Sequence, residues 1–354
     1  MKKYTILVFF GGASSEYGVS LQSAYSVIQA VDRSQYEPVL IGITEEGRWL
    51  HFTGSIEKIK EDRWQNDEDC TEVLLRPGER SIWLQQGDRL RRIEADAAFP
   101  VLHGKNGEDG SIQGLLQMMG IPVIGCGVLA SALCMDKYRA HQLVSLGGIS
   151  VPRARVFQRK ESEADAALAW ADQIGYPIYV KPVKAGSSYG ITKALNQEQL
   201  IRGMEKAFVY DDEVMIEENI EGFEVGCAVL GSGNALVMGE IDEIELSKKE
   251  GSDDFFDYAE KYTLETARIH VPARIEAEMK EQVKKTAKEI YERLGCAGFA
   301  RVDMFITPQK EIVFNEVNTI PGFTEHSRYP NMMRAAGMSF QKMVDRVLQQ
   351  EVNR

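Results

Sequence analysis

The feature that most constrains the fold is a pair of alternating segments near the carboxyl end of the chain. They read GFARVDMFIT, residues 298–307, and EIVFNEVN, residues 311–318. Apolar and polar residues alternate in both, as in strands with one buried face, and the polar stretch between them is short, which predicts an antiparallel hairpin. If TPQK or PQKE forms a four-residue turn, Ile306 pairs with Glu311. The rest of the register follows from that pair.

This register places Arg301 opposite Glu316 and Asp303 opposite Phe314. Because side chains alternate along a strand, the polar residues of both strands are expected on one face of the hairpin. They are Arg301, Asp303, Glu316 and Asn318. Oxygen ligands without His or Cys are typical of Mg²⁺, which keeps further positions for phosphate oxygens and water. The alternative is an ordinary pairing of Arg with carboxylates at a strand end.

The amino end of the chain has the pattern of an α/β unit. YTILVFF, residues 4–10, predicts a buried strand, and residues 19–31 predict a helix with Ser20 as its capping residue. The loop between them, GGASSEYG, suits a carboxylate or another anion at a helix N-terminus, and Glu16 could hold an ammonium group. The alternative is a helix-initiating turn with a solvated Glu16.

A second glycine-rich loop, VKAGSSYG, follows a predicted strand at residues 176–182. Its backbone N–H groups and hydroxyls, with Lys181 and Lys184, could hold phosphate, although most Gly/Ser loops are only turns. The chain contains neither the Walker A lysine pattern nor the GxGxxG dinucleotide pattern. A phosphate site here would therefore be of another type.

The predicted elements divide the chain into three parts. Alternating strands and helices predict an α/β domain over residues 1–126, and changes of pattern predict further domains over residues 127–219 and 220–354. Two polar stretches, residues 51–95 and 240–265, show little periodicity.

Composition limits the classes of partner. The net charge of −12 and the pI near 5.1 argue against nucleic acid or an anionic membrane surface. The five cysteines are odd in number and lack a CxxC pair, which favours reduced thiols over a disulfide framework. The first apolar run spans seven residues, too few for a signal peptide or a membrane span. We therefore expect a soluble cytoplasmic protein.

Six motifs occur along the chain in the order LHGKNGEDGSIQG, MDKYRA, VKPVKAGSSYGITK, FFDYAEKY, GFARVDMF and NEVNTIPGFTEHSRYP. Together they resemble the D-alanine–D-alanine ligase family of ATP-grasp enzymes, from about residue 5 to 345. The resemblance implies an α/β (α+β) ATP-grasp fold with an N-terminal Rossmann-like domain, a central domain and a C-terminal domain. It also implies a homodimer and an ATP-dependent ligase. In that reaction the carboxylate of one D-alanine attacks the γ-phosphate, and the amine of a second amino acid then displaces phosphate.

The resemblance implies a nucleotide and metal site. The residues that would contact ATP are Lys137, Lys181, Glu217, Glu218, Ile220 and Glu224. Two Mg²⁺ or Mn²⁺ ions would be held by Asp303, Glu316 and Asn318. Arg301 and Gly322 would stabilise the negative charge that both steps build up.

The resemblance also implies a site for the first amino acid. Glu16, Ser187 and Tyr262 would form a hydrogen-bonded set that orients D-alanine, with His103 beside it. The set would latch a mobile loop over about residues 240–265. Closure of this loop would exclude water, which would otherwise hydrolyse the acyl phosphate.

The second substrate is implied by a finer resemblance. AEKY, with Tyr262, favours an amino acid over D-lactate, and HSRYP with FFDYAEKY resembles the D-alanine–D-serine ligases of vancomycin-resistant bacteria. The guanidinium of Arg328 could donate to a serine hydroxyl. Other residues implied in substrate binding are Asp242, Phe256, Lys261 and Ser327. The alternatives are a housekeeping D-alanine–D-alanine ligase and an Arg328 that only pairs with a surface acid.

Two other classes of protein are less well matched. A different ATP-grasp ligase would share the nucleotide site without the Glu16, Ser187 and Tyr262 set, and all three residues are present. An inactive binding protein would be expected to have lost a metal ligand or a phosphate lysine, and this chain retains them. The sequence therefore predicts an active ligase.

Overall fold

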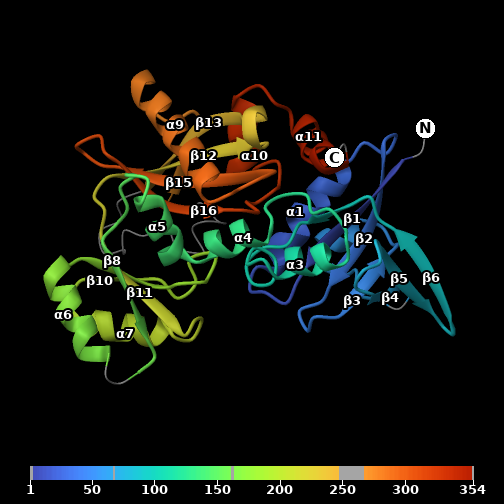
Figure 1. Cartoon of the computed structure of the whole chain (residues 1–354), viewed down its shortest axis with the longest axis horizontal. Coiled ribbons are helices and arrows are strands. Elements are labelled where there is room, and N and C mark those ends of the chain that lie inside the picture. The colour runs from blue at the N-terminus through green and yellow to red at the C-terminus, as the bar shows by residue number, and fades with distance from the viewer. Residues whose placement is uncertain (1–2, 67, 161–162, 247–266, 353–354) are drawn as a thin grey trace.

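The computed structural model describes residues 3–66, 68–160, 163–246 and 267–352. Its strands form three sheets of seven, four and five strands. In Figure 1 the seven-stranded sheet forms one lobe and the other two sheets form a second lobe. Within the described ranges, no helix combines the length and apolar character needed to cross a bilayer.

The seven-stranded sheet has the order β6-β5-β4-β3-β2-β1-β7. Strands β1 (Tyr4–Gly11), β2 (Tyr36–Ile43) and β7 (Ala97–Pro100) are parallel, and helix α1 (Tyr17–Ala30) connects β1 to β2. This is the predicted α/β unit.

The predicted helix cap is wrong. Helix α1 begins at Tyr17, and Ser20 lies buried inside it. The Ser20 hydroxyl instead joins two strand ends, because it accepts from the Gly11 N–H at 2.9 Å and donates to the Val101 carbonyl.

The polar stretch over residues 51–95 contains antiparallel strands that extend this sheet. In chain order its elements are β3 (Trp49–Phe52), α2 (Glu57–Lys60), β4 (Cys70–Leu75), β5 (Ser81–Gln86) and β6 (Arg89–Glu94). After β7 the chain continues into helix α3 (Ser111–Met118). Many of the strand residues at this end of the sheet are exposed, so the sequence lacks the apolar alternation of a half-buried strand. The sheet is therefore mixed rather than purely parallel.

The four-stranded sheet is antiparallel, in the order β10-β9-β11-β8. Two short helices precede it in the chain, and two more pack against it. In chain order these elements are α4 (Val128–Met135), α5 (Lys137–Ser145), β8 (Ala154–Gln158), α6 (Ala164–Ile174), β9 (Ile178–Pro182), β10 (Thr192–Ala194), α7 (Gln197–Ala207) and β11 (Glu213–Glu218).

The five-stranded sheet is also antiparallel, in the order β14-β13-β12-β15-β16. Its elements and the helices around it are β12 (Phe223–Leu230), the 3-10 turn η2 (Gly233–Ala235), β13 (Val237–Leu246), β14 (Ala267–His270), α9 (Ala277–Arg293), β15 (Phe299–Ile306), β16 (Ile312–Asn318), α10 (Arg328–Ala335) and α11 (Phe340–Val352). Helix α9 packs on one face, in a core that includes Val302 and Met304 of β15. Because side chains alternate, Arg301 and Asp303 project from the opposite face.

The hairpin β15–β16 has the predicted polar face but not the predicted register. Ile306 pairs with Ile312 rather than Glu311, and the turn is closed by a hydrogen bond of 3.0 Å from the Thr307 N–H to the Glu311 carbonyl. This shift of one residue would by itself place the polar residues of the two strands on opposite faces.

A β-bulge restores the shared face. Asn315 is an extra residue between the pair Met304–Phe314 and the pair Asp303–Glu316. Phe314, predicted opposite Asp303, turns instead into the core beneath α9. His141 of α5 satisfies the bulge, because its Nε2–H donates to the Asn315 carbonyl at 2.7 Å.

The carboxyl-terminal helix returns to the amino-terminal lobe. Val344 and Leu348 of α11 share one core with Ile6 and Val8 of β1, and α11 lies beside α1 in Figure 1. Contacts thus cross between the two lobes, and the predicted division into three domains stays a prediction.

Deleting Asn315 should leave the polar face intact, because Glu316 would then follow Phe314 directly and pair with Asp303 in an unbroken ladder. The deletion removes the carbonyl that accepts from His141, so it should cost about 1–3 kcal/mol of the free energy of unfolding. Asn315→Gly keeps the extra residue and its carbonyl, so its cost should be about 1 kcal/mol or less. Urea unfolding of both variants measures the difference, and a loss of the folded state on deletion would contradict this register.

Candidate active site

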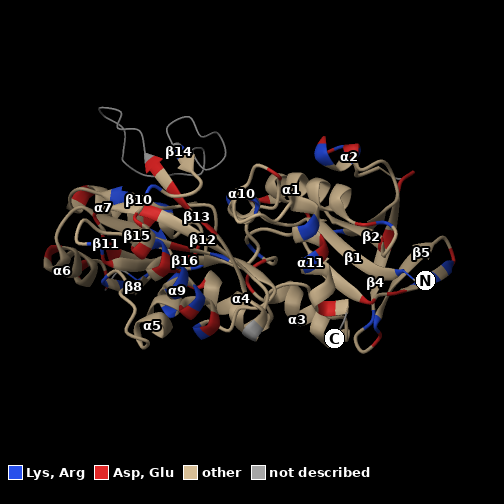
Figure 2. Ribbon diagram, turned by 90° about the horizontal axis from the view of Figure 1, so that it is seen from above, with Lys and Arg blue, Asp and Glu red and all other residues tan. Residues whose placement is uncertain are grey.

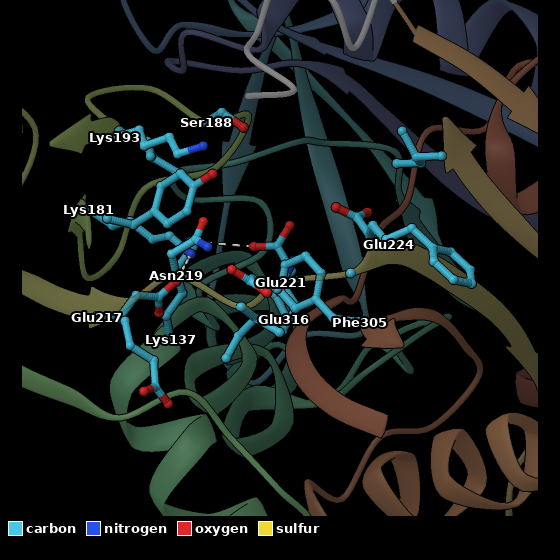
Figure 3. Close-up of a pocket in the computed structure, with 18 of the residues that line it drawn as sticks. Lys137, Lys181, Ser188, Lys193, Glu217, Asn219, Glu221, Glu224, Phe305 and Glu316 are labelled. Atoms are coloured by element: carbon cyan, nitrogen blue, oxygen red, sulfur yellow. Dashed lines mark ion pairs between the residues drawn. The ribbon is translucent and has the colours of Figure 1, made fainter. Parts of the chain in front are cut away.

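A cleft with a volume of about 720 Å³ is lined by residues of both the four-stranded and the five-stranded sheet. Figure 3 shows Lys181 and Lys193 on one side, and Glu224 and Phe305 on the opposite side. Basic and acidic residues are interspersed over both lobes in Figure 2, so the gathering of lysines here is local. The volume is in the range of ligand-binding pockets.

Two of the predicted phosphate-binding lysines line this cleft. Lys181 pairs with Glu217, and Lys137 donates to the Ala185 carbonyl at 2.6 Å and lies 3.7 Å from Glu316. Each lysine is only 8% exposed. Buried ammonium groups need such partners, and an entering phosphate could compete for them.

Acidic residues form a row across the five-stranded sheet. Asp242 on β13 and Asp303 on β15 both pair with Gly226 on β12, and Asp303 pairs in turn with Glu316 on β16. Gly226 leaves room in this row, because a Cβ there would lie 2.6 Å from both Arg328 Nη2 and Asp242 Oδ1. The missing side chain is what lets a guanidinium enter between the acids.

The predicted metal-binding residues fit a magnesium site by their chemistry. Arg301 Nη2 donates to Asp303 at 2.7 Å, and Asn318 Nδ2 donates to the same carboxylate at 3.0 Å. No cluster of three or more His, Cys, Asp or Glu that could hold a metal ion occurs among the described residues, so the Asn318 amide and ligand oxygens would complete the coordination. Two carboxylates, an amide and an adjacent open cleft are the donors that Mg²⁺ uses with phosphates.

The Arg328 side chain is mostly covered and is surrounded by acids. Its Nε and Nη2 donate to Asp242 at 2.7 and 2.9 Å, its Nη1 donates to Glu224 at 2.9 Å, and Nη2 lies 3.4 Å from Asp303 Oδ1. Asp242 and Arg328 therefore meet, as the sequence predicts. Asp242 and Asp303 are buried and Glu224 is half-buried, so the alternative that Arg328 only pairs with a surface acid is wrong.

Glu16 and Ser187 also meet as predicted, because the Ser187 hydroxyl donates to the Glu16 carboxylate. Glu16 is 6% exposed, and a Cβ on Gly104 or Gly186 would lie 2.3 or 2.5 Å from its Oε2. Both glycines are thus required for this carboxylate to sit between the two loops.

The loop that carries Ser187 has an unusual backbone. Ser187 and Ser188 have φ angles of 47° and 59°, in the left-handed region that side chains other than glycine rarely adopt. Strain of this kind persists only where surrounding contacts hold it, and it gathers at ligand-binding loops.

His103 lies near Glu16 in the folded protein, but both of its ring nitrogens have protein partners. Nδ1 lies 2.8 Å from the Ile320 carbonyl and Nε2 lies 3.0 Å from the Ser23 hydroxyl. Because a carbonyl only accepts, Nδ1 carries the hydrogen and Nε2 accepts from Ser23. Burial lowers the pKa of His103 to about 4, so the ring is neutral at neutral pH.

Four further predicted residues, Ile220, Glu218, Gly322 and Ser327, lie in or near the cleft region. Ile220 and Glu218 both line the cleft, and the Glu218 side chain accepts from Arg153 Nε at 2.6 Å. Gly322 is adjacent to Ser327, whose hydroxyl accepts from the Thr324 N–H at 3.2 Å.

Lys184 points away from the cleft. Its ammonium group donates to Glu213 at 2.7 Å instead of sharing a site with Lys181.

Three predicted residues, Phe256, Lys261 and Tyr262, lie outside the described residues. The predicted mobile loop begins too early, because its first residues belong to strand β13. The side chains of this strand alternate between the cleft face, which carries Asp242, and the α9 face, which carries Ile241.

Sequence reasoning missed two residues of this region. Lys193 lines the cleft on the short strand β10, where no pattern in the sequence marks it. Glu108 belongs to the LHGKNGEDGSIQG motif, and its carboxylate accepts from the Gly104 and Ile320 N–H groups at 3.0 and 2.9 Å. Burial and the nearby charge of Glu16 raise the pKa of Glu108 to about 8.

His103 should make stability fall as pH drops. Its pKa in the folded protein, about 4, lies below the ordinary 6.5, so the unfolded chain binds the proton first. The contribution is complete above pH 6.5 and is lost as pH falls toward 4, by about 3 kcal/mol in total. His103→Asn, which does not titrate, should lose less stability between about pH 7 and about pH 4.5 in urea unfolding. Equal losses in both proteins would contradict this.

Comparison with known proteins supplies the family. The family models described as D-ala D-ala ligase N-terminus and D-ala D-ala ligase C-terminus match residues 5–126 and 143–349. The chain is 43% identical over 351 residues to the vancomycin C-type resistance protein VanC1 of Enterococcus gallinarum, with 98% of each chain covered. It is 40% identical over 354 residues to a D-alanine–D-alanine ligase of Caldicellulosiruptor bescii, with 98% of this chain and 95% of that one covered.

A solved structure agrees with these matches. The VanG D-Ala:D-Ser ligase from Enterococcus faecalis superposes with a TM-score of 0.90 at 49% identity, covering 99% of this chain and 100% of that one. The predicted ATP-grasp fold is thereby confirmed. The protein therefore belongs to the D-alanine–D-alanine ligase family and is an ATP-dependent D-alanine ligase.

Proposed function

We propose that this ligase joins D-alanine to D-serine through a D-alanyl phosphate, for peptidoglycan precursors with the altered ends that underlie vancomycin resistance. The observation that carries the proposal is the Arg328 side chain, which is only 9% exposed and is held in place by the fully buried Asp242. The competing function is that of a housekeeping D-alanine–D-alanine ligase. A homodimer, implied by the resemblance, stays a prediction.

The cleft is the proposed nucleotide site. ATP with two Mg²⁺ (or Mn²⁺) ions would supply the phosphoryl group and neutralise much of its charge. Lys137 and Lys181 would donate to the phosphates, while Asp303, Glu316 and Asn318 would provide the oxygen ligands. The remaining contacts to the nucleotide would come from Glu217, Glu218, Ile220 and Glu224.

The first D-alanine would lie between the two lobes. Glu16 is a buried carboxylate, and its contact with Ser187 aligns it at the rim of the glycine–serine loop. A carboxylate there can hold the ammonium group of D-alanine, which leaves the substrate carboxylate free to attack phosphorus. Arg301 and the Gly322 N–H would then stabilise the charge that develops.

Two relatives support D-serine as the second substrate. The VanG protein, at 49% identity, is a D-Ala:D-Ser ligase, and VanC1, at 43% identity, is a vancomycin C-type resistance protein. Overall identity does not decide the matter, because a protein named D-alanine–D-alanine ligase is 40% identical. The choice therefore depends on the side chains of the second subsite.

Arg328 can favour D-serine by donating to its hydroxyl. Because Asp242 and Glu224 already hold the guanidinium, D-alanine does not leave it without partners, and the gain reduces to the added hydrogen bond. A hydrogen bond to a charged group contributes about 1.5–3 kcal/mol, which corresponds to a preference on the order of ten- to hundredfold. Because the guanidinium already has partners, we expect a preference for D-serine of about tenfold.

Glu316→Gln should reduce ATP-dependent phosphate release by at least about a hundredfold, because it removes a charged oxygen ligand. Thermal unfolding should show an intact fold. Glu325→Gln, an exposed glutamate in the loop after β16, is the control and should retain full activity. Normal turnover in Glu316→Gln would remove the metal assignment.

Competition between equal amounts of D-serine and D-alanine tests the second substrate. The wild type should form mostly D-alanyl-D-serine. Arg328→Leu alone would leave Asp242 buried without a counterion, so the informative variant is Arg328→Leu with Asp242→Asn, which keeps an acceptor for the Gly226 N–H. This variant should shift the products toward D-alanyl-D-alanine by about tenfold.

The control for this experiment is Arg334→Leu, an exposed arginine on the same helix α10. It should keep the wild-type product ratio. A wild type that forms mostly D-alanyl-D-alanine, or a ratio that the double variant leaves unchanged, would favour the housekeeping ligase.

A further inference from the structure

Both backbone groups of Ile320 are held by side chains from the other lobe. The N–H of Ile320 donates to Glu108 Oε1 at 2.9 Å, and its carbonyl accepts from His103 Nδ1 at 2.8 Å. Glu108 lies 212 residues away in the chain. The segment after β16 has left the sheet, so its polar backbone groups need such partners.

Ser23 of α1 extends this set of contacts. Its hydroxyl accepts from the Phe323 N–H at 3.2 Å and donates to His103 Nε2, which lies 3.0 Å away. Ser23 is fully buried and His103 is 4% exposed. The backbone on both sides of Gly322 is thus held by three side chains of the amino-terminal lobe.

Glu108 also holds a second segment. Its Oε2 accepts from the Gly104 N–H at 3.0 Å. Gly104 forms the wall against Glu16, since a Cβ there would lie 2.3 Å from Glu16 Oε2. One carboxylate therefore joins the loop behind Glu16 to the backbone that leads into Gly322.

We propose that Glu108, with His103 and Ser23, acts as a positioning group that sets the distance between the amino acid end and the phosphate end of the site. This inference rests on the proposed function, in which Glu16 binds D-alanine and the Gly322 N–H faces the reacting phosphoryl group. The two reacting atoms come from ligands held by different lobes. A connection between those lobes therefore decides how well the atoms are aligned.

The expected effect is on rate rather than on affinity. A displacement of about 1 Å between reacting groups costs on the order of a hundredfold in rate. Substrate binding relies on other side chains, namely Glu16 and the lysines of the cleft. Loosening the Ile320 segment should therefore lower kcat and leave KM nearly unchanged.

Glu108→Gln and Ser23→Ala test the proposal in the full-length enzyme. Glu108→Gln can accept only one of the two N–H groups, and Ser23→Ala loses the acceptor for Phe323. Each should lower kcat by about ten- to hundredfold, with KM for ATP and D-alanine within about twofold of wild type.

The matched control is Tyr291→Phe, which removes a buried hydrogen bond of 2.8 Å to the Gly231 carbonyl in the core on the α9 face. It should lower the unfolding temperature without changing kcat. A comparison of His103→Asn with His103→Leu tests whether a side-chain donor at this position restores kcat. Asn keeps a donor near the position of Nδ1 and should retain more kcat than Leu.

Two outcomes would overturn the proposal. If Glu108→Gln and Ser23→Ala lose only stability, as Tyr291→Phe does, the contacts are structural. If KM for D-alanine rises while kcat stays the same, these residues bind substrate themselves.

Failure of the proposed function would appear separately, as a wild type that forms mostly D-alanyl-D-alanine. The contacts of Glu108 and Ser23 with the backbone of Ile320 and Phe323 can be measured independently by amide hydrogen exchange. Exchange at Ile320 in Glu108→Gln and at Phe323 in Ser23→Ala should be at least about tenfold faster than in wild type. Unchanged exchange at these amides would overturn the proposal.

Discussion

The bulge at Asn315 is the constraint on which the rest of the site depends. If Asn315 instead paired with Asp303 in a regular ladder, Glu316 and Asn318 would point into the core beneath α9. Because Asn315 is left out of the pairing, they share a face with Asp303. The bulge in turn depends on His141, since a ladder interrupted in this way leaves a carbonyl that needs a donor.

Charge burial follows from this arrangement. Arg328 pairs with Asp242, Arg301 with Asp303, and Lys181 with Glu217, and all six side chains are nearly buried. Buried pairs of this kind are weak evidence for stability, because the loss of hydration offsets most of the attraction between the charges. Their value here is to hold charged groups in fixed positions around a cleft. A substrate or nucleotide then meets groups that are already oriented.

Small residues decide where those groups can lie. Gly226 opens the row of acids to a guanidinium, and Gly104 and Gly186 allow the Glu16 carboxylate to sit between two loops. Contacts between the lobes complete the site, because Glu108 and Ser23 hold a backbone segment more than 200 residues away. The amino-terminal lobe therefore shapes the phosphate end of the site as well as the amino acid end.

The sequence by itself determined the family and the polar face of the hairpin, and it assigned Asp242 and Arg328 to one substrate site, since motifs and alternation are local properties of the chain. Tertiary structure alone decided the register of the hairpin, the face of the sheet from which Phe314 projects, and the partners of Arg328 and His103. An extra residue in a strand shows no signal in hydrophobic alternation until the opposite strand is known. Exposed strands such as β6 lack the apolar alternation that marks a half-buried strand, and hydrogen bonds like that of Glu108 to Ile320 join residues that only the folded chain brings together.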